Sequence, residues 1–191
     1  MSASSLLRTA RHARGVSQRE LARAAHVSQP GIAAVESGAH DTTLDRLDLL
    51  LVPLGQRVSL LPTRARPVWQ VAVDLRAALE ASDEKRAWRE IVQCSDDLAR
   101  ETHATRVALA VTQPLPVGDS RYDAVLAAVT DYHLSRDGLP RPVWLDLPEY
   151  QLAEPWDVEE VPSLRDRARS DTPPAIARHG VFLAAAELAS V

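Results

Sequence analysis

Residues 16–38, the stretch that decides the fold, read VSQRELARAAHVSQPGIAAVESG. Ser17 is followed three residues later by Glu20, which is the spelling of a capping box, so a helix is predicted to begin directly after Ser17. Ser28 can likewise cap the N-terminus of a helix, and a second helix is predicted over 29–36. The stretch therefore predicts two short helices joined by a tight turn.

Apolar residues on helical spacing flank this pair of helices. One helix is predicted over 4–14, and Thr43 is expected to cap another that runs to about residue 54. The expected core of this small domain consists of Leu7, Ala10, Leu21, Ala22, Val27, Ile32, Val35, Leu44 and Leu47. Two helices joined by a short turn and supported by others are typical of helix-turn-helix proteins, in which the second helix enters the DNA major groove.

Residues 6–54 resemble the lambda-repressor/Cro-type helix-turn-helix family, the XRE family of transcriptional regulators. The matching motifs are S-Q-x-E-L-A at 17–22, V-S-Q at 27–29 and E-x-G at 36–38. The resemblance implies a DNA-binding domain, and the tail L-G-x-x-V-x-L-x-P after the last helix is similar to antitoxin-type members. From residue 119 onward the chain loosely resembles the tails of uncharacterised actinobacterial regulators of this family, and that similarity implies no mechanism.

The expected DNA contacts lie at helix N-termini. Gln18 can hold a phosphate at the start of its helix, and Gln29 can read adenine with both ends of its amide, or else be solvated. The resemblance implies the same two roles, and it implies a structural ion pair between Arg11 and Glu36. The complete set of expected DNA-binding residues is Gln18, Arg19, Arg23, Ser28, Gln29, Gly31, Ala33, Ala34, His40 and Thr42.

These contacts differ in kind. Arg19 and Arg23 either reach phosphates or are solvated, and the resemblance places His40 and Thr42 near the DNA backbone. The small residues Gly31, Ala33 and Ala34 offer only close approach or contact with a thymine methyl group. Specificity is therefore expected to depend on Gln29, Ser28 and DNA shape.

A short strand is predicted after the last helix of this domain. Residues 57–60 alternate polar and apolar side chains, and a lone strand leaves an unpaired edge. Pairing with a second copy through Arg57, Val58, Ser59 and Leu60 would satisfy that edge, and packing on its own domain is the alternative. The predicted organisation is a domain over 1–61 with a dimerising strand at 56–61, a linker over 62–67 and a second domain over 68–191.

The second domain is predicted to be mostly helical, all-α or α+β. Helices are expected from Val68 to Leu79, from Ser82 to Leu98 and from Ser120 to about residue 137, whereas 106–111 reads as a buried strand or a helical turn. The stretch 139–163 is rich in proline and is expected to be mainly extended, with Trp144 and Trp156 as anchors in the core or at an interface. The overall fold class is mainly α.

Composition limits the chemistry. The first 66 residues carry nine arginines and five acidic residues, a net charge of +4, whereas residues 67–191 carry a net charge of −8. A basic head and an acidic body suggest a polyanion-binding module joined to one that avoids polyanions. The single cysteine, Cys94, excludes an intramolecular disulfide, and His103, His133 and His179 lack the spacing of metal ligands on one helix. No catalytic residue, metal or cofactor is predicted, and the absence of a signal sequence or membrane span predicts a cytoplasmic protein.

The sequence therefore predicts a homodimeric DNA-binding regulator that binds a palindromic operator in double-stranded DNA. The leading version is a repressor that is the antitoxin of a toxin–antitoxin operon, with the cognate toxin bound by the C-terminal half. The first alternative is a small-molecule-responsive repressor with a pocket in 139–183. The second is an enzyme tethered to a DNA-binding head, which the absence of a catalytic constellation disfavours.

Overall fold

The computed structural model describes residues 2–159 and 161–188, and it divides the chain into two compact units. The first unit comprises residues 2–62 and 112–115, and the second comprises 63–111 and 116–188. Residues 63–67, expected in the linker, belong to the second unit, where Arg66 donates 2.8 Å hydrogen bonds to Asp74 and Glu90. Helices dominate both units, so the mainly α fold class is confirmed.

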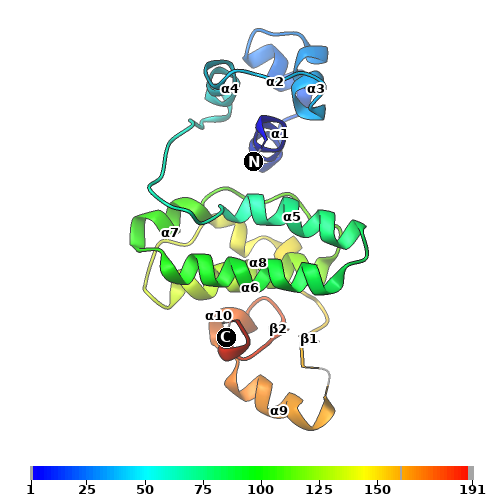
Figure 1. Ribbon diagram of the computed structural model, residues 1–191, viewed down its shortest axis with the longest axis vertical. Helices are drawn as coiled ribbons and strands as arrows, with labels where there is room; N and C mark the ends of the chain where they lie inside the picture. Colours follow the sequence, from blue (N-terminus) through cyan, green and yellow to red (C-terminus); the bar gives the residue numbers. More distant parts are fainter. Residues whose placement is uncertain (1, 160, 189–191) are drawn as a thin grey trace. The chain divides into compact units, whose positions relative to one another are not determined.

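The first unit consists of short helices with side-chain caps (Figure 1). They are α1 (Ala3–Ala13), α2 (Gln18–Ala24), α3 (Gln29–Ser37), α4 (Leu44–Leu51) and the 3₁₀ turn η1 (Val52–Leu54). The hydroxyl oxygens of Ser17, Ser28 and Thr43 accept backbone N–H groups at the starts of α2, α3 and α4. Each cap satisfies a donor that the helix itself leaves unpaired, which explains why these helices begin where the sequence predicted.

The core of the first unit lies between these helices and follows the predicted apolar positions with one error. Leu7, Leu21 and Ile32 are fully buried. Leu44 was expected in the core but is 63% exposed. It is the first residue of α4, and side chains of a helix point back toward its N-terminus, so this one projects past the end of the core.

The strand predicted over residues 57–60 is not formed in the single chain, where this segment is irregular. The Val58 N–H donates a 2.9 Å hydrogen bond to Oδ1 of Asp48 on α4, and Arg57 pairs with the other carboxylate oxygen at 2.6 Å. The Val58 side chain packs against the core of its own unit. A strand requires a neighbouring strand, and these contacts tie the segment to a helix instead. Leu60, in contrast, is 94% exposed.

The second unit contains longer helices followed by short elements. The helices are α5 (Val68–Glu80), α6 (Glu84–Arg100), α7 (His103–Ala110), α8 (Ser120–Ser135), α9 (Pro162–Asp171) and α10 (Pro174–Ala177). The 3₁₀ turns are η2 (Val143–Asp146), η3 (Pro148–Tyr150) and η4 (Ala185–Leu188), and the strands are β1 (Trp156–Asp157) and β2 (Val181–Phe182). The segment 106–111, which read as a strand or a helical turn, is helical over 106–110 as the end of α7, and Val111 caps that helix. Helix α9 was not predicted.

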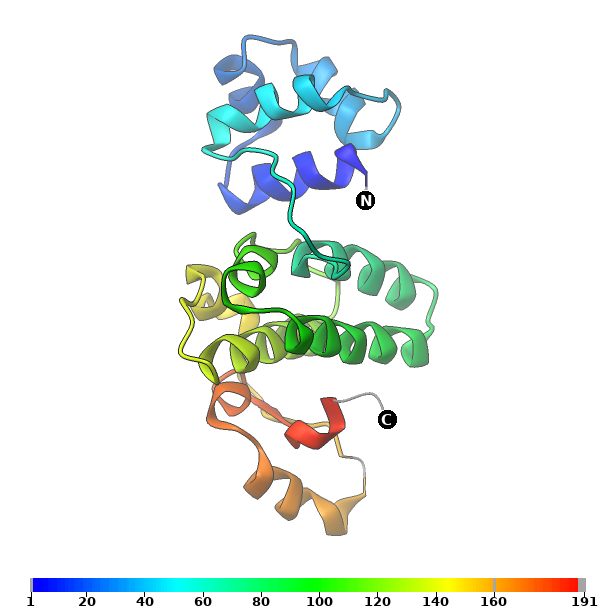
Figure 2. The same ribbon diagram turned by 60° about the vertical axis from the view of Figure 1, so that its left-hand side comes forward.

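Helix α8 is the centre of the second unit. It lies beside α5 and α6 in both views (Figures 1 and 2), and α10 and β2 also pack against it. Nearly every residue from Tyr122 to Leu134 is buried, on all sides of the helix. A helix that is buried on every side is covered by other elements, so this one organises the unit around itself.

Strands β1 and β2 form a parallel pair in which Trp156 lies opposite Val181. The Trp156 N–H donates to the Gly180 carbonyl at 2.8 Å, and the Val158 N–H donates to the Phe182 carbonyl at 3.1 Å. Gly180 has a φ of +73°, and a Cβ there would lie 2.8 Å from the Leu152 carbonyl oxygen. Glycine is therefore required at this close approach, and the pairing fixes Trp156 against the helical core.

Candidate nucleic-acid interface

Helices α2 and α3 are joined by a four-residue turn that is closed by backbone contacts. The Val27 N–H donates to the Ala22 carbonyl at 2.9 Å, and His26 adopts a left-handed conformation with a φ of 55°. The hydroxyl of Ser28 accepts the Gly31 N–H at 3.2 Å at the start of α3. A Cβ at residue 31 would lie 3.1 Å from that oxygen. This turn places Gln29, the first residue of α3, within hydrogen-bond distance of Gln18, the first residue of α2.

A chain of hydrogen bonds links four side chains from three helices. Arg11 of α1 donates to both carboxylate oxygens of Glu36, at 2.6 and 2.9 Å. Gln18 Nε2 donates to Glu36 Oε2 at 3.0 Å, and Gln29 Nε2 donates to Gln18 Oε1 at 2.9 Å. The chain therefore runs from the interior of the unit to the first residue of α3.

The inner end of this chain is a buried ion pair. Burial raises the pKa of the Glu36 carboxyl, but the hydrogen bonds from Arg11 and Gln18 and the charge of Arg11 outweigh burial, so the pKa is lowered from its ordinary value. Arg11 also donates to the Val16 carbonyl at 2.8 Å. Arg8 donates to the backbone carbonyl of Glu36 at 2.6 Å, a contact that sequence reasoning missed although Arg8 and Arg11 lie one turn apart on α1. Glu36 is thus ionised and fixed.

At the outer end of the chain, the Gln29 amide retains capacity for a ligand. One N–H is used by Gln18, and within the described residues the second N–H and Oε1 have no hydrogen-bond partner. An amide with a free donor and a free acceptor matches the N7 acceptor and N6–H donor that adenine presents in the major groove. Gln18 likewise keeps one amide N–H for an acceptor such as a phosphate oxygen.

The other expected contact residues are accessible to different degrees. Arg19, Arg23, Ser28 and His40 are exposed, whereas Gly31, Ala33, Ala34 and Thr42 are half-buried. The Thr42 hydroxyl is buried and has no partner among the described residues. The structure thus joins Gln18 and Gln29 directly and leaves the arginines of α2 free to extend into solvent.

The second unit holds most of its buried polar groups on or against α8. Asp131 is fully buried and binds Arg141 through both oxygens at 2.6 and 2.9 Å, with Arg178 at 3.3 Å and His179 Nε2 at 3.1 Å. Burial raises the pKa of the Asp131 carboxyl, but hydrogen bonds from His179, Arg141 and Ser135 lower it well below its ordinary value. Because its partners satisfy this carboxylate, it is a structural anchor that joins α8 to the segments after it.

Two further buried groups of α8 have opposite pKa shifts. Asp123 accepts the Val117 N–H at 2.9 Å, and burial raises the pKa of its carboxyl to about 6. His133 Nε2 lies 2.8 Å from the Ser95 hydroxyl, and burial lowers the pKa of its imidazole to about 4. Both members of this serine–histidine pair are buried, so no substrate reaches the hydroxyl in this conformation.

Burial and the neighbouring Asp97 raise the pKa of the Cys94 thiol to about 12. Within residues 2–159 and 161–188, no three histidine, cysteine or acidic side chains gather as metal ligands. In the same part of the chain, no helix combines the length and the hydrophobicity needed to cross a bilayer.

Comparison with known proteins places the similarity in the first unit. Residues 7–61 match the family model described as Helix-turn-helix. An uncharacterized HTH-type transcriptional regulator of Haemophilus influenzae is 40% identical over 58 residues, which cover 30% of this chain and 59% of that relative. No solved structure matches the chain. Together with the capped helices α2 and α3, these matches identify residues 7–61 as a helix-turn-helix domain of the lambda-repressor/Cro type, the XRE family.

Proposed function

We propose that this protein is a sequence-specific DNA-binding transcriptional regulator that places α3 in the major groove of a duplex. The supporting observation is the hydrogen-bond chain from Arg11 through Glu36 and Gln18 to Gln29. This chain fixes the Gln29 amide at the start of α3 before DNA binds. A fixed side chain loses less conformational entropy on binding, so its hydrogen bonds to adenine contribute more to base discrimination.

Contacts to the DNA backbone would come from α2 and the loop before α4. Gln18 offers its second amide N–H at the N-terminus of α2, where the helix dipole favours a phosphate. The exposed Arg19 and Arg23 lie on the same helix and add positive charge, and the exposed His40 would approach the backbone from the loop. The hydroxyl of Thr42 is buried in this conformation, so Thr42 would contribute through its backbone. These contacts position the domain without reading sequence.

The regulator is proposed to act as a homodimeric repressor on a palindromic operator, with half-sites about 34 Å apart. Residues 56–61 would form the dimer contact by pairing with the same segment of a second copy. Leu60 is 94% exposed in the single chain, and Leu61 is also exposed. Pairing would cover Leu60 and would complete a strand from a segment that is irregular in the single chain.

Binding of the full-length protein to a fluorescent duplex from upstream of its own gene tests this function. Gln29→Ala is expected to reduce the preference for the operator over a scrambled duplex by about 1–3 kcal/mol, because it removes a base contact. Arg23→Ala is expected to weaken both duplexes alike and to lower the salt dependence by about one counterion. Arg167→Ala, an exposed arginine of the second unit, serves as the control. Equal weakening of both duplexes by Gln29→Ala would contradict the assigned role of Gln29.

The finer proposal is that the repressor is an antitoxin whose acidic second unit binds the toxin encoded beside it. The charge division supports this, because the first 66 residues carry +4 and the remainder −8. A body that repels DNA remains available to a protein partner while the head is bound. Co-expression with each neighbouring gene tests the proposal. It predicts a stable complex and relief of growth arrest, and failure of both results for every neighbour would reject it.

A second candidate, a small-molecule-responsive repressor, is favoured by a cleft of about 620 Å³ in the second unit. A cleft of this size accommodates a metabolite-sized ligand. One wall comes from residues 156–158, within the stretch in which a pocket was expected, and the other walls come from α6 and α8. In this version, ligand binding to the second unit would change the affinity of the full-length dimer for its operator.

A further inference from the structure

We infer that the cleft between the start of α6, the start of α8 and β1 binds a small ligand that carries an aromatic ring and an anionic group. Three aromatic side chains line the cleft, Trp88 from α6, Tyr122 from α8 and Trp156 from β1. The chain holds only eight aromatic residues in all. Their convergence from three separate elements supplies flat apolar surfaces for a planar ring.

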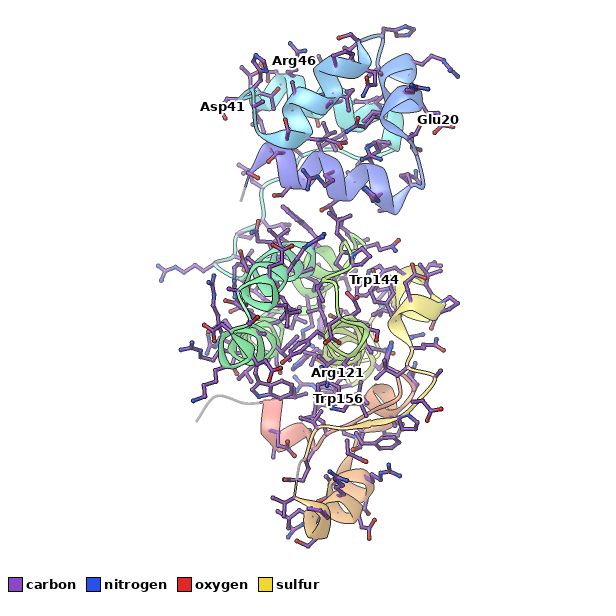
Figure 3. All side chains as sticks on the ribbon, turned by 90° about the vertical axis from the view of Figure 1, so that its right-hand side faces the viewer. Glu20, Asp41, Arg46, Arg121, Trp144 and Trp156 are labelled. Carbon is purple, nitrogen blue, oxygen red and sulfur yellow. The ribbon has the colours of Figure 1, made fainter. Side chains whose placement is uncertain are left out.

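The aromatic walls are fixed by the surrounding fold. Trp156 is held by the β1–β2 pairing, and its ring centroid lies 6.1 Å from that of Tyr122. The Arg121 guanidinium lies over the Trp156 ring at 5.5 Å and is also held by Asp119, with an Nη2 to Oδ2 distance of 3.0 Å. Figure 3 shows the labelled Arg121 and Trp156 together. A preformed wall needs little ordering when a ligand enters.

The charges of the lining favour an anion. Lys85 and Arg89 line the cleft, and neither has a hydrogen bond or ion pair within residues 2–159 and 161–188. Asp157 also lines the cleft, but Arg169 neutralises it through two hydrogen bonds of 2.6 and 2.8 Å. The other acidic residue that lines the cleft is Glu84, and no ion pair within the described residues offsets its charge. The two unpaired cations therefore outnumber it.

This arrangement specifies a ligand class. An uncharged aromatic compound would use the rings but leave Lys85 and Arg89 without a partner, and an aliphatic acid would use the cations but not the rings. An aromatic carboxylate satisfies both features at once. Ligand binding to the cleft is measured without DNA and does not depend on the second proposed function. Only the claim that the ligand regulates operator binding rests on that function.

Isothermal titration of the full-length protein with 2-naphthoate tests the inference. Two matched compounds separate the contributions of ring and charge, namely 2-naphthamide, which is uncharged, and cyclohexanecarboxylate, which has no aromatic ring. We expect 2-naphthoate to bind with a dissociation constant of about 1 mM or tighter and at least about tenfold better than either matched compound. The absence of binding at about 10 mM, or equal binding of 2-naphthoate and its amide, would overturn the inference.

Variants locate the site. The double variant Lys85→Gln, Arg89→Gln should weaken 2-naphthoate binding about tenfold, whereas Arg100→Gln, Arg167→Gln removes the same charge from exposed positions outside the cleft and should leave it unchanged. Glu84→Gln should strengthen binding. Equal effects of the two double variants would place the ligand elsewhere and refute the assignment. If the ligand binds at the cleft but leaves operator affinity unaltered, the second proposed function fails while the inference stands.

Discussion

The ion pair between Arg11 and Glu36 allows stability and DNA recognition to be separated by mutation. Their side chains are 11% and 3% exposed, and two hydrogen bonds join them. Glu36→Gln keeps the shape of the side chain but leaves the buried guanidinium without a countercharge. Breaking such a pair typically costs about 3–5 kcal/mol, and we expect about 3 kcal/mol because Arg11 keeps its hydrogen bond to Val16.

Hydrogen exchange read by mass spectrometry is the appropriate assay for this variant. The four tryptophans, at positions 69, 88, 144 and 156, all lie in the second unit, so fluorescence does not report unfolding of the first unit. For peptides covering 29–37 in Glu36→Gln, exchange through global opening should accelerate about 150-fold, which corresponds to 3 kcal/mol. Glu20→Gln, an exposed position at which glutamine preserves the capping box, should change exchange less than about threefold.

A second variant completes the test. Arg11→Met combined with Glu36→Leu replaces the ion pair by apolar groups and should restore stability to within about 1 kcal/mol. It also removes the acceptor of Gln18, so Gln29 is held less firmly and operator preference should fall although the domain is stable. A Glu36→Gln protein that exchanges like the unmodified protein would refute the energetic reasoning. A stable double variant with full operator preference would refute the positioning role.

Three further predictions concern pH, burial and assembly. Between pH 4 and 6, the raised pKa of Asp123 (about 6) makes the folded second unit bind more protons than the unfolded chain, so the contribution of Asp123 to the free energy of unfolding falls as pH rises. The lowered pKa of His133 (about 4) has the opposite effect, and the contribution of His133 to the free energy of unfolding rises with pH up to 6.5. The two effects oppose each other, so Asp123→Asn should unmask a slope of about +1.4 kcal/mol per pH unit in urea unfolding followed by tryptophan fluorescence near pH 5; an unchanged slope would contradict the assignment. Asp131→Asn should destabilise the second unit by about 3–5 kcal/mol in the same assay, because Arg141 loses a buried partner; a loss below 1 kcal/mol would contradict its anchoring role. Leu60→Glu should yield monomers in sedimentation velocity if residues 56–61 form the dimer contact, with Leu164→Glu, also exposed, as the control; unaltered dimers would exclude this contact.

The helix-turn-helix region was predictable because its signals are local. A serine before each helix start and a glutamate three residues after Ser17 act within one turn of the chain, and the structure has the corresponding caps. The link from Gln18 to Gln29 was not predicted, because it depends on how α2 and α3 meet in space. The strand predicted over 57–60 is absent from the single chain for the same reason, since the alternation of side chains contains no information about the Asp48 carboxylate that accepts the Val58 N–H.

The second unit was predictable only in outline. Its long apolar helices follow the 3.6-residue period, whereas α9 reads PSLRDRARSD and has no apolar stripe to reveal it. Its contacts are remote in sequence, such as Arg169 with Asp157 and with the Phe182 ring. The cleft likewise combines residues of three segments separated by more than thirty positions, so only the tryptophan-rich wall gave a signal in the sequence.

Helix α8 is covered both by elements that precede it in the sequence and by elements that follow it, and this determines when the second unit can form during synthesis. Its partners α5 and α6 precede it, but α10 and β2 follow it by some forty residues, and until they are translated the side of α8 that they cover faces water. At that stage of synthesis the first unit, whose contacts are near in sequence, can be folded, whereas the second unit is incomplete and exposes an apolar surface. A ribosome that stalls after α8 would leave that surface open to chaperones and to aggregation.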